Sequence, residues 1–180
     1  CRRVGRASDC VARGAFDAHI VAHGPPSAKR TAVLLTTPDR LQPASPGSLR
    51  GPLHKTARHI GRRGLLVLIS DLYEEPDAVL EAVAPLRFRG NDIVVFHLLD
   101  EQELRPKFKD PVLLEDMESG DTMEVTPQYA ATEYKDKITS HCDDMASRLR
   151  GAGLDYTLVD TSRPLDEALR GYLAARKGRM

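Results

Sequence analysis

Three short apolar runs constrain the fold of this chain most: LLVLI at residues 65–69, IVVFHLL at 93–99 and YTLV at 156–159. The first two are nearly continuous rather than alternating, which is typical of strands that are covered on both faces. Each run is followed, sooner or later, by a helical pattern. Strands that alternate with helices favour a parallel sheet. The sequence therefore predicts an α/β, Rossmann-like fold with a doubly wound, mostly parallel sheet.

Acidic residues, proline and glycine mark the ends of the helices between these runs. A helix is expected to begin at residues 74–77, and Pro85 should end or kink its last turn before Gly90 and Asn91 stop it. A long, polar helix is expected over 127–150 and a weaker one over 49–60. The last helix should open at Thr161 and Ser162. Its buried side chains are expected to be Leu165, Ala168, Leu169 and Leu173.

Other segments interrupt the alternation of strands and helices. Residues 112–125 (VLLEDMESGDTMEV) contain two short β-type runs around a Ser-Gly-Asp turn, which predicts an inserted β-hairpin. Residues 9–16 and 19–23 are candidates for a second hairpin, and residues 28–35 look helical. The first part of the chain is therefore less regular than the second.

Charge and cysteine content bear on partners and location. Lysine plus arginine and aspartate plus glutamate both number 26, so the chain has no net charge that would favour nucleic acid or an anionic membrane. No apolar run approaches the ~20 residues of a membrane span. The three cysteines (Cys1, Cys10 and Cys142) form no regular pattern, which favours a reducing compartment. We expect a cytoplasmic protein.

An aspartate follows each of the three apolar runs: Asp71, Asp100 and Asp160. Parallel strands gather such carboxylates at one edge of a sheet, where oxygen ligands could hold Mg²⁺. Helix capping is the competing interpretation, and we favour it for Asp160 with Thr161 and Ser162. Asp100 precedes a charged loop and is expected to be solvated. Asp71 is the best metal candidate, because two residues separate it from the next helix start.

Signatures of catalysis are absent from the sequence. It contains no GxxxxGK[ST] phosphate loop, no GxGxxG after a strand, no GxSxG elbow and no HExxH metal motif. His97 lies inside an apolar run and is expected to be a core residue. His141 and Cys142 are adjacent on a predicted helix, where neighbouring side chains do not face each other. These patterns favour binding over catalysis.

The segments GLLVLISDLYEEPDAVLEAV, PVLLEDMESGDTMEV and GLDYTLVDTSRPLDEAL closely resemble the domain-of-unknown-function family fifty-eight, from about Arg63 to Lys177. This bacterial group has a von Willebrand factor A-like fold and is often encoded beside MoxR-type AAA+ ATPases. The resemblance implies a von Willebrand factor A-like domain that acts with such an ATPase.

The resemblance also implies a metal-ion-dependent adhesion site, built from a DxSxS loop, a middle-loop hydroxyl and an aspartate after the fourth strand. Asp71 matches the last position. In the middle loop Gly47 stands where threonine is usual, and Ser48 supplies the only oxygen. The DxSxS loop does not occur in this chain. We expect Asp71 and Ser48 to form an incomplete site, with Mg²⁺ bound only by a complete domain.

The family's first strand and helix also have no counterpart here, so residues 1–180 are expected to form one partial domain. Residues 1–48 match poorly and residues 49–178 match well. The function favoured by the sequence is a non-catalytic, protein-binding adaptor. Two alternatives stay open: a magnesium-dependent hydrolase that uses Asp71, Asp100 and Asp160, and a truncated family member without function.

Overall fold

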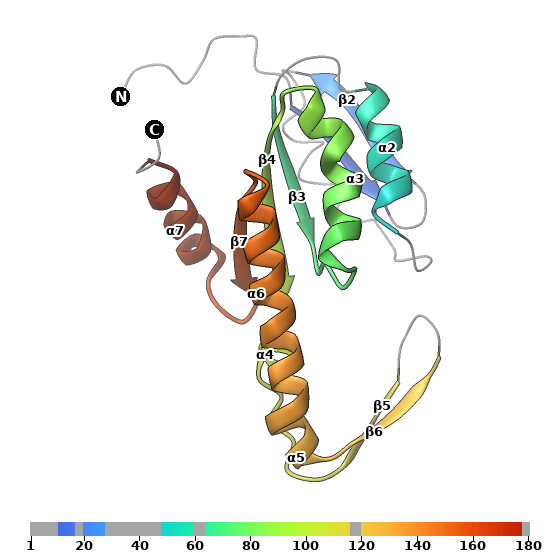
Figure 1. Cartoon of the computed structure of the whole chain (residues 1–180), viewed down its shortest axis with the longest axis vertical. Helices are drawn as coiled ribbons and strands as arrows, with labels where there is room; N and C mark the ends of the chain where they lie inside the picture. The colour runs from blue at the N-terminus through green and yellow to red at the C-terminus, as the bar shows by residue number, and fades with distance from the viewer. Residues whose placement is uncertain (1–10, 17–19, 28–47, 60–63, 116–119, 178–180) are drawn as a thin grey trace. The chain divides into compact units, whose positions relative to one another are not determined.

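The computed structural model describes residues 11–16, 20–27, 48–59, 64–115 and 120–177 (Figure 1). The chain forms two compact units, Cys1–Gly61 and Arg62–Met180. The first contains an antiparallel pair of strands and a helix. The second contains a parallel sheet, its helices and a separate hairpin. Whether one partial domain spans the whole chain stays a prediction.

In the first unit, β1 (Val11–Phe16) pairs antiparallel with β2 (Ile20–Ser27). The register places Gly14 opposite His23 and shifts twice along the ladder. The hairpin expected from residues 9–16 and 19–23 is thereby confirmed. Helix α2 (Arg50–His59) confirms the helix expected over 49–60. The helix expected over 28–35 lies outside the described residues.

The second unit is built on three parallel strands in the order β3-β4-β7. They are β3 (Leu65–Ser70), β4 (Asp92–Leu99) and β7 (Asp155–Asp160), so all three predicted strands are confirmed. The register places Leu68 beside Val95 and Val95 beside Tyr156. This architecture is α/β with a parallel sheet and is compatible with a Rossmann-like fold.

The helices of this unit are α3 (Pro76–Phe88), α4 (Glu101–Leu104), α6 (Lys135–Gly151) and α7 (Leu165–Lys177). The long helix expected over 127–150 is confirmed, but it begins as α5 (Pro127–Tyr129) and a π-helical turn, η2 (Ala130–Tyr134). Pro85 does not end α3, which continues to Phe88. A proline in the last turn removes one helical hydrogen bond, and the remaining residues still close that turn.

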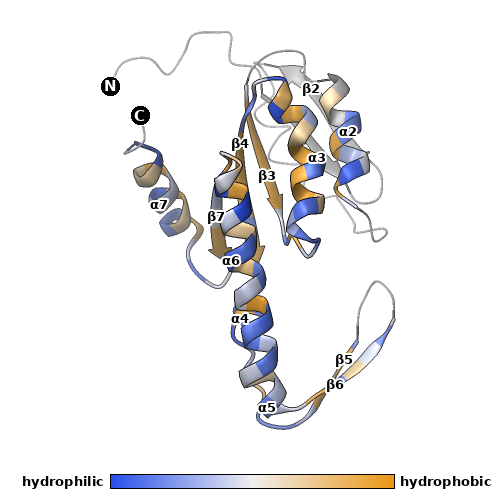
Figure 2. Cartoon of the chain, in the orientation of Figure 1, coloured by the Kyte–Doolittle hydropathy of each residue, from blue (hydrophilic) through white to orange (hydrophobic). Residues whose placement is uncertain are grey.

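Helices α3 and α6 pack on each other, and their buried side chains form the core of the unit. The other face of the sheet is covered only in part. Strands β3 and β4 are both strongly hydrophobic (Figure 2), yet Leu65, Val67 and Ile69 of β3 are 58%, 46% and 60% exposed. The expectation that both faces of β3 are covered was therefore wrong. Strand β3 lies at the edge of this sheet, whereas β4 lies in its middle.

Helix α7 does not bury the leucines expected to face the core. Leu165, Leu169 and Leu173 are 61%, 39% and 56% exposed. The helix instead contacts the sheet through Tyr172, whose ring meets the ring of Phe96 edge-on at 5.4 Å between centroids. The spacing of apolar residues predicts which side of a helix is apolar, but not which tertiary surface that side meets.

The inserted hairpin is confirmed. It consists of β5 (Val112–Glu115) and β6 (Thr122–Val125), which pair antiparallel and form a sheet of their own. Gly120 adopts φ 75°, the left-handed conformation that glycine takes without steric cost in a tight turn. No helix in the described part of the chain is long and apolar enough to cross a membrane.

Candidate functional site

Asp71 lies in an ordered turn at the carboxyl end of β3. Its Oδ1 accepts a hydrogen bond from Ser70 Oγ at 3.2 Å, and Ser70 Oγ accepts one from the Leu72 N–H at 3.3 Å. Leu72 has φ 48°, in the left-handed region that favours glycine, yet its side chain is fully buried. Burial of this leucine therefore holds the turn in place and leaves the Asp71 carboxylate exposed at the end of the strand.

Asp100 caps helix α4 and is not merely solvated, which corrects the sequence-based expectation. Its Oδ1 accepts a hydrogen bond from the Gln102 N–H at 2.9 Å, and the Asp100 N–H donates to Glu103 Oε2 at 2.6 Å. Together these bonds form a capping box. Asp100 Oδ2 also accepts from Thr161 Oγ1 at 3.3 Å. The structure thus joins the ends of β4 and β7 through Asp100 and Thr161.

Asp160 stabilises the turn before α7 and does not cap that helix as expected, because α7 begins at Leu165 and not at Thr161 and Ser162. Its Oδ1 accepts hydrogen bonds from the N–H and the hydroxyl of Ser162 at 3.0 and 2.5 Å. Its Oδ2 lies 3.1 Å from Arg105 and 3.6 Å from Arg163. The Ser162 hydroxyl, followed by the two arginines, lowers the pKa of Asp160. The carboxylate is thus already neutralised by residues of this chain.

Among the described residues, no group of three His, Cys, Asp or Glu side chains is arranged to hold a metal ion. Asp100 and Asp160 are each occupied by a cap or an ion pair. Ser48 belongs to the first unit, where its Oγ accepts a hydrogen bond from the Arg50 N–H at 3.2 Å, at the start of α2. The pairing of Ser48 with Asp71 in a metal site stays a prediction, and we derive no metal chemistry from it.

A buried polar cluster lies beneath this edge, centred on His97 as a core residue of β4. The His97 side chain is 0% exposed, and its Nδ1 lies 2.7 Å from the hydroxyl of Tyr156. His141 packs against His97 with their rings 6.0 Å apart, and its Nε2 lies 2.8 Å from the carbonyl oxygen of Leu72. The cluster therefore ties β4, β7, α6 and the turn after β3 together.

Burial lowers the pKa of His97, and the nearby His141 lowers it further, while Asp71 and Glu103 oppose the shift. Nε2 of His97 has no hydrogen-bond partner within the described residues. Burial also raises the pKa of the Cys142 thiol. A raised pKa makes a thiol less reactive as a nucleophile. Sequence reasoning missed Tyr156 and His141, because only the strand register and the α6 packing bring them to His97.

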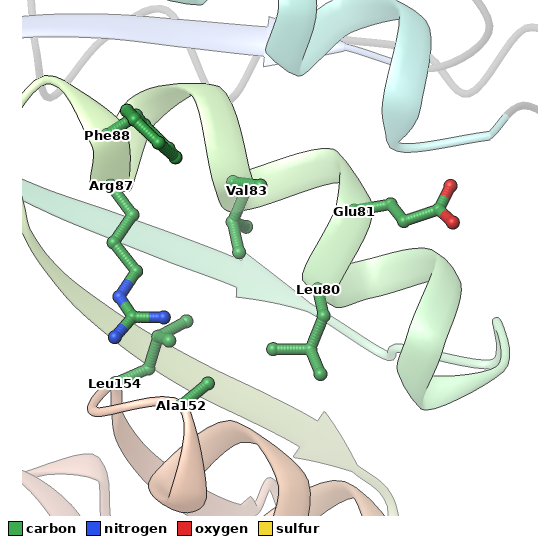
Figure 3. Close-up of a pocket in the computed structure, with 8 residues that line it drawn as sticks. Leu80, Glu81, Val83, Arg87, Phe88, Ala152 and Leu154 are labelled. Carbon is green, nitrogen blue, oxygen red and sulfur yellow. The ribbon is translucent and has the colours of Figure 1, made fainter.

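An apolar groove of about 700 Å³ lies between α3 and the turn after α6. In Figure 3, Leu80 and Val83 point toward Ala152 and Leu154, whereas Glu81 points away. Phe88, at the end of α3, is 96% exposed. Substrate sites place several convergent polar groups in such a pocket. Here the charged side chains of the lining are Glu81 and Arg87.

Comparison of the chain with protein-family models, with curated proteins and with solved structures gives no match.

Proposed function

We propose that this chain is a non-catalytic, protein-binding adaptor module. One observation carries the proposal. Strand β3 directs Leu65, Val67 and Ile69 to the same face of the sheet, and each of them is about half exposed. Contiguous apolar surface of this kind marks interaction sites on soluble proteins.

The chemistry at the carboxyl edge of the sheet agrees with a binding role. The carboxylates of Asp100 and Asp160 stabilise turns and a helix end, and burial raises the pKa of the Cys142 thiol on α6. An edge strand also presents main-chain groups that a partner strand can bond. A partner can therefore bind to groups that this edge strand already presents, whereas hydrolysis would require catalytic groups in addition to them.

The resemblance to the family fifty-eight proteins extends this proposal to a partner. The expected partner is a MoxR-type AAA+ ATPase, and the expected location is the bacterial cytoplasm. Support for both comes from the resemblance of residues 63–177 alone, which is an argument by analogy.

The test is to measure binding of the purified chain to the MoxR-type ATPase encoded nearest to it, by surface plasmon resonance. Val67→Asp places a charge on the exposed β3 face and should weaken binding about tenfold or more, equivalent to ~1.4 kcal/mol. Leu173→Asp, which changes a similarly exposed leucine on α7, is the matched control and should bind as the unaltered chain does.

Two results would count against the proposal. Absence of binding by the unaltered chain would remove the ATPase as partner. Equal binding by Val67→Asp and the unaltered chain would remove β3 as the binding surface. Circular dichroism of each variant confirms that the fold is retained.

A further inference from the structure

The hairpin β5–β6 has two chemically different faces. In the ladder Val112 lies opposite Val125 and Leu114 opposite Met123, while Leu113 lies opposite Glu124 and Glu115 opposite Thr122. Because directly opposed residues share a face, one face is wholly apolar and the other carries both glutamates. Val125, on the apolar face, is buried, whereas Leu114 and Met123 further along the same face are 45% and 49% exposed.

All the charge on this hairpin is negative. Residues 112–125 contain five acidic side chains and no lysine, arginine or histidine. Glu115 and Glu124 are exposed, and neither forms an ion pair with any residue that the structure describes. A partner that covers this surface therefore gains from carrying positive charge.

The hairpin also has two open edges within the described structure. Strands β5 and β6 pair only with each other, in a sheet of two strands. An isolated two-stranded ribbon is marginally stable in water, and a third strand adds main-chain hydrogen bonds along a free edge. Leu113 is 70% exposed, so apolar side chains are open to solvent on both faces of the ribbon.

We propose that the hairpin β5–β6 is a strand-addition site for an extended segment of another protein that alternates apolar and basic residues. Side chains of an added strand point to opposite faces in turn. Apolar residues of the segment then extend the face of Leu114 and Met123, and its lysine or arginine residues meet Glu115 where it pairs with β5 or Glu124 where it pairs with β6. This inference rests on the proposed function of the chain as a protein-binding module. It places a binding surface on the hairpin β5–β6, which is separate from the one proposed on β3.

A second copy of this hairpin fits the site poorly. Pairing two such hairpins brings the acidic face of one against the acidic side chains of the other, and like charges directly opposite are unfavourable. An anionic lipid surface is disfavoured for the same reason. A segment that alternates apolar and basic residues places its apolar side chains on the apolar face and its basic side chains on the acidic face of the hairpin.

The experiment uses the full chain and three synthetic peptides of equal length with a fluorescent label, followed by fluorescence anisotropy. The first alternates valine and lysine, the second alternates valine and glutamate, and the third has a block of valines followed by a block of lysines. We expect the alternating valine–lysine peptide to bind and the other two to bind about tenfold or more weakly. Binding should weaken as salt is added.

Two double variants locate the site. Glu115→Lys with Glu124→Lys should weaken binding of the valine–lysine peptide about tenfold, and Leu114→Ser with Met123→Ser should weaken it by a similar factor. Glu133→Lys with Asp136→Lys, on exposed positions of the long helix, makes the same change in net charge and should leave binding unaltered. All these side chains are exposed, so the variants should fold, which circular dichroism checks.

Three outcomes would overturn the proposal. Equal binding of the alternating and block peptides would mean that charge alone attracts them. Equal effects of the hairpin and control variants would place the binding elsewhere. A dimer of the chain in sedimentation velocity that Leu114→Ser with Met123→Ser abolishes would make a second copy the occupant. Val67→Asp separates this proposal from the proposed function, because it should leave peptide binding intact whether or not it affects the ATPase.

Discussion

Strands β3 and β4 have similar sequences and opposite surroundings. Both are nearly continuous apolar runs, LLVLIS and DIVVFHLL, and they pair in register over six residues. In β4 the side chains of Val94 and Val95 are buried on opposite faces. In β3 only Leu68 is fully buried, and the three residues on its other face are exposed. Position in the sheet, and not the apolarity of a strand, decides what becomes core.

This difference gives the two strands different roles. Strand β4 is held on both sides, by β3 and β7, and carries His97 into the interior. Strand β3 contributes one face to the core and offers the other to solvent. Because one apolar face of β3 lies outside the core, that face is available for binding. The proposed function is assigned to β3 for this reason.

The largest expected contrast is between aspartate substitutions on these two strands. Val95→Asp buries a carboxylate in the core and should reduce the free energy of unfolding by about 4 kcal/mol or more. Val67→Asp leaves the new carboxylate at an exposed position, and its cost should stay within about 1 kcal/mol. Urea unfolding followed by circular dichroism measures both. Similar losses for the two variants would show that the outer face of β3 is covered in solution.

Sequence reasoning predicted the strands, the main helices and the hairpin because their signals are local. The run LLVLI and the Ser-Gly-Asp turn each act through neighbouring residues. Burial of Leu165, Leu169 and Leu173 was predicted incorrectly, since it depends on the tertiary surface that lies opposite them and not on their spacing along the helix. The left-handed conformation of Leu72 has no sequence signal, because a buried leucine rarely adopts it.

The candidate site was predictable only in part. Asp160 was expected to cap the last helix, but it bonds the Ser162 N–H in a turn that precedes α7 (Leu165–Lys177). The cap at Asp100 was missed, although the spacing of Asp100 and Glu103 matches a capping box and could have revealed it. The contact between His97 and Tyr156 joins residues 59 positions apart and follows from the register of β4 with β7. No local pattern encodes such a register.

The next largest effect is expected where β4 meets β7. Tyr156→Phe removes the hydroxyl that bonds Nδ1 of His97 and keeps the ring, so a buried nitrogen loses its partner. The free energy of unfolding should fall by about 1–3 kcal/mol. The matched control is Tyr172→Phe, whose hydroxyl bonds Arg176 near the surface and should cost less. Denaturant unfolding of both variants at neutral pH tests this. An unchanged stability for Tyr156→Phe would mean that water replaces the lost hydroxyl.

The buried His97 of β4 should also make the free energy of unfolding fall at acidic pH, and β3 carries no such group. The pKa of His97 is lowered in the folded chain, so the unfolded chain binds the proton first as pH falls. The contribution of His97 to stability is therefore present above its unfolded pKa of about 6.5 and is lost as pH falls below it. His97→Gln should flatten the fall in unfolding free energy between neutral and mildly acidic pH, relative to the unaltered chain.

The control for this measurement is His54→Gln, because the side chain of His54 is exposed on α2. Its stability curve should keep the same slope with pH as that of the unaltered chain. An identical slope for His97→Gln and the unaltered chain would show that protonation of other groups, and not of His97, causes the acid sensitivity.

The smallest effect is expected on α7, whose apolar residues resemble those of β3 in being exposed. Leu173→Ser should change the free energy of unfolding by no more than about 0.5 kcal/mol, because the leucine is more than half exposed already. Tyr172→Ala, one residue earlier, removes the ring that packs on Phe96 and should cost clearly more. Thermal unfolding of the two variants makes the comparison. A larger loss for Leu173→Ser than for Tyr172→Ala would mean that α7 presents its leucines, and not Tyr172, to the sheet.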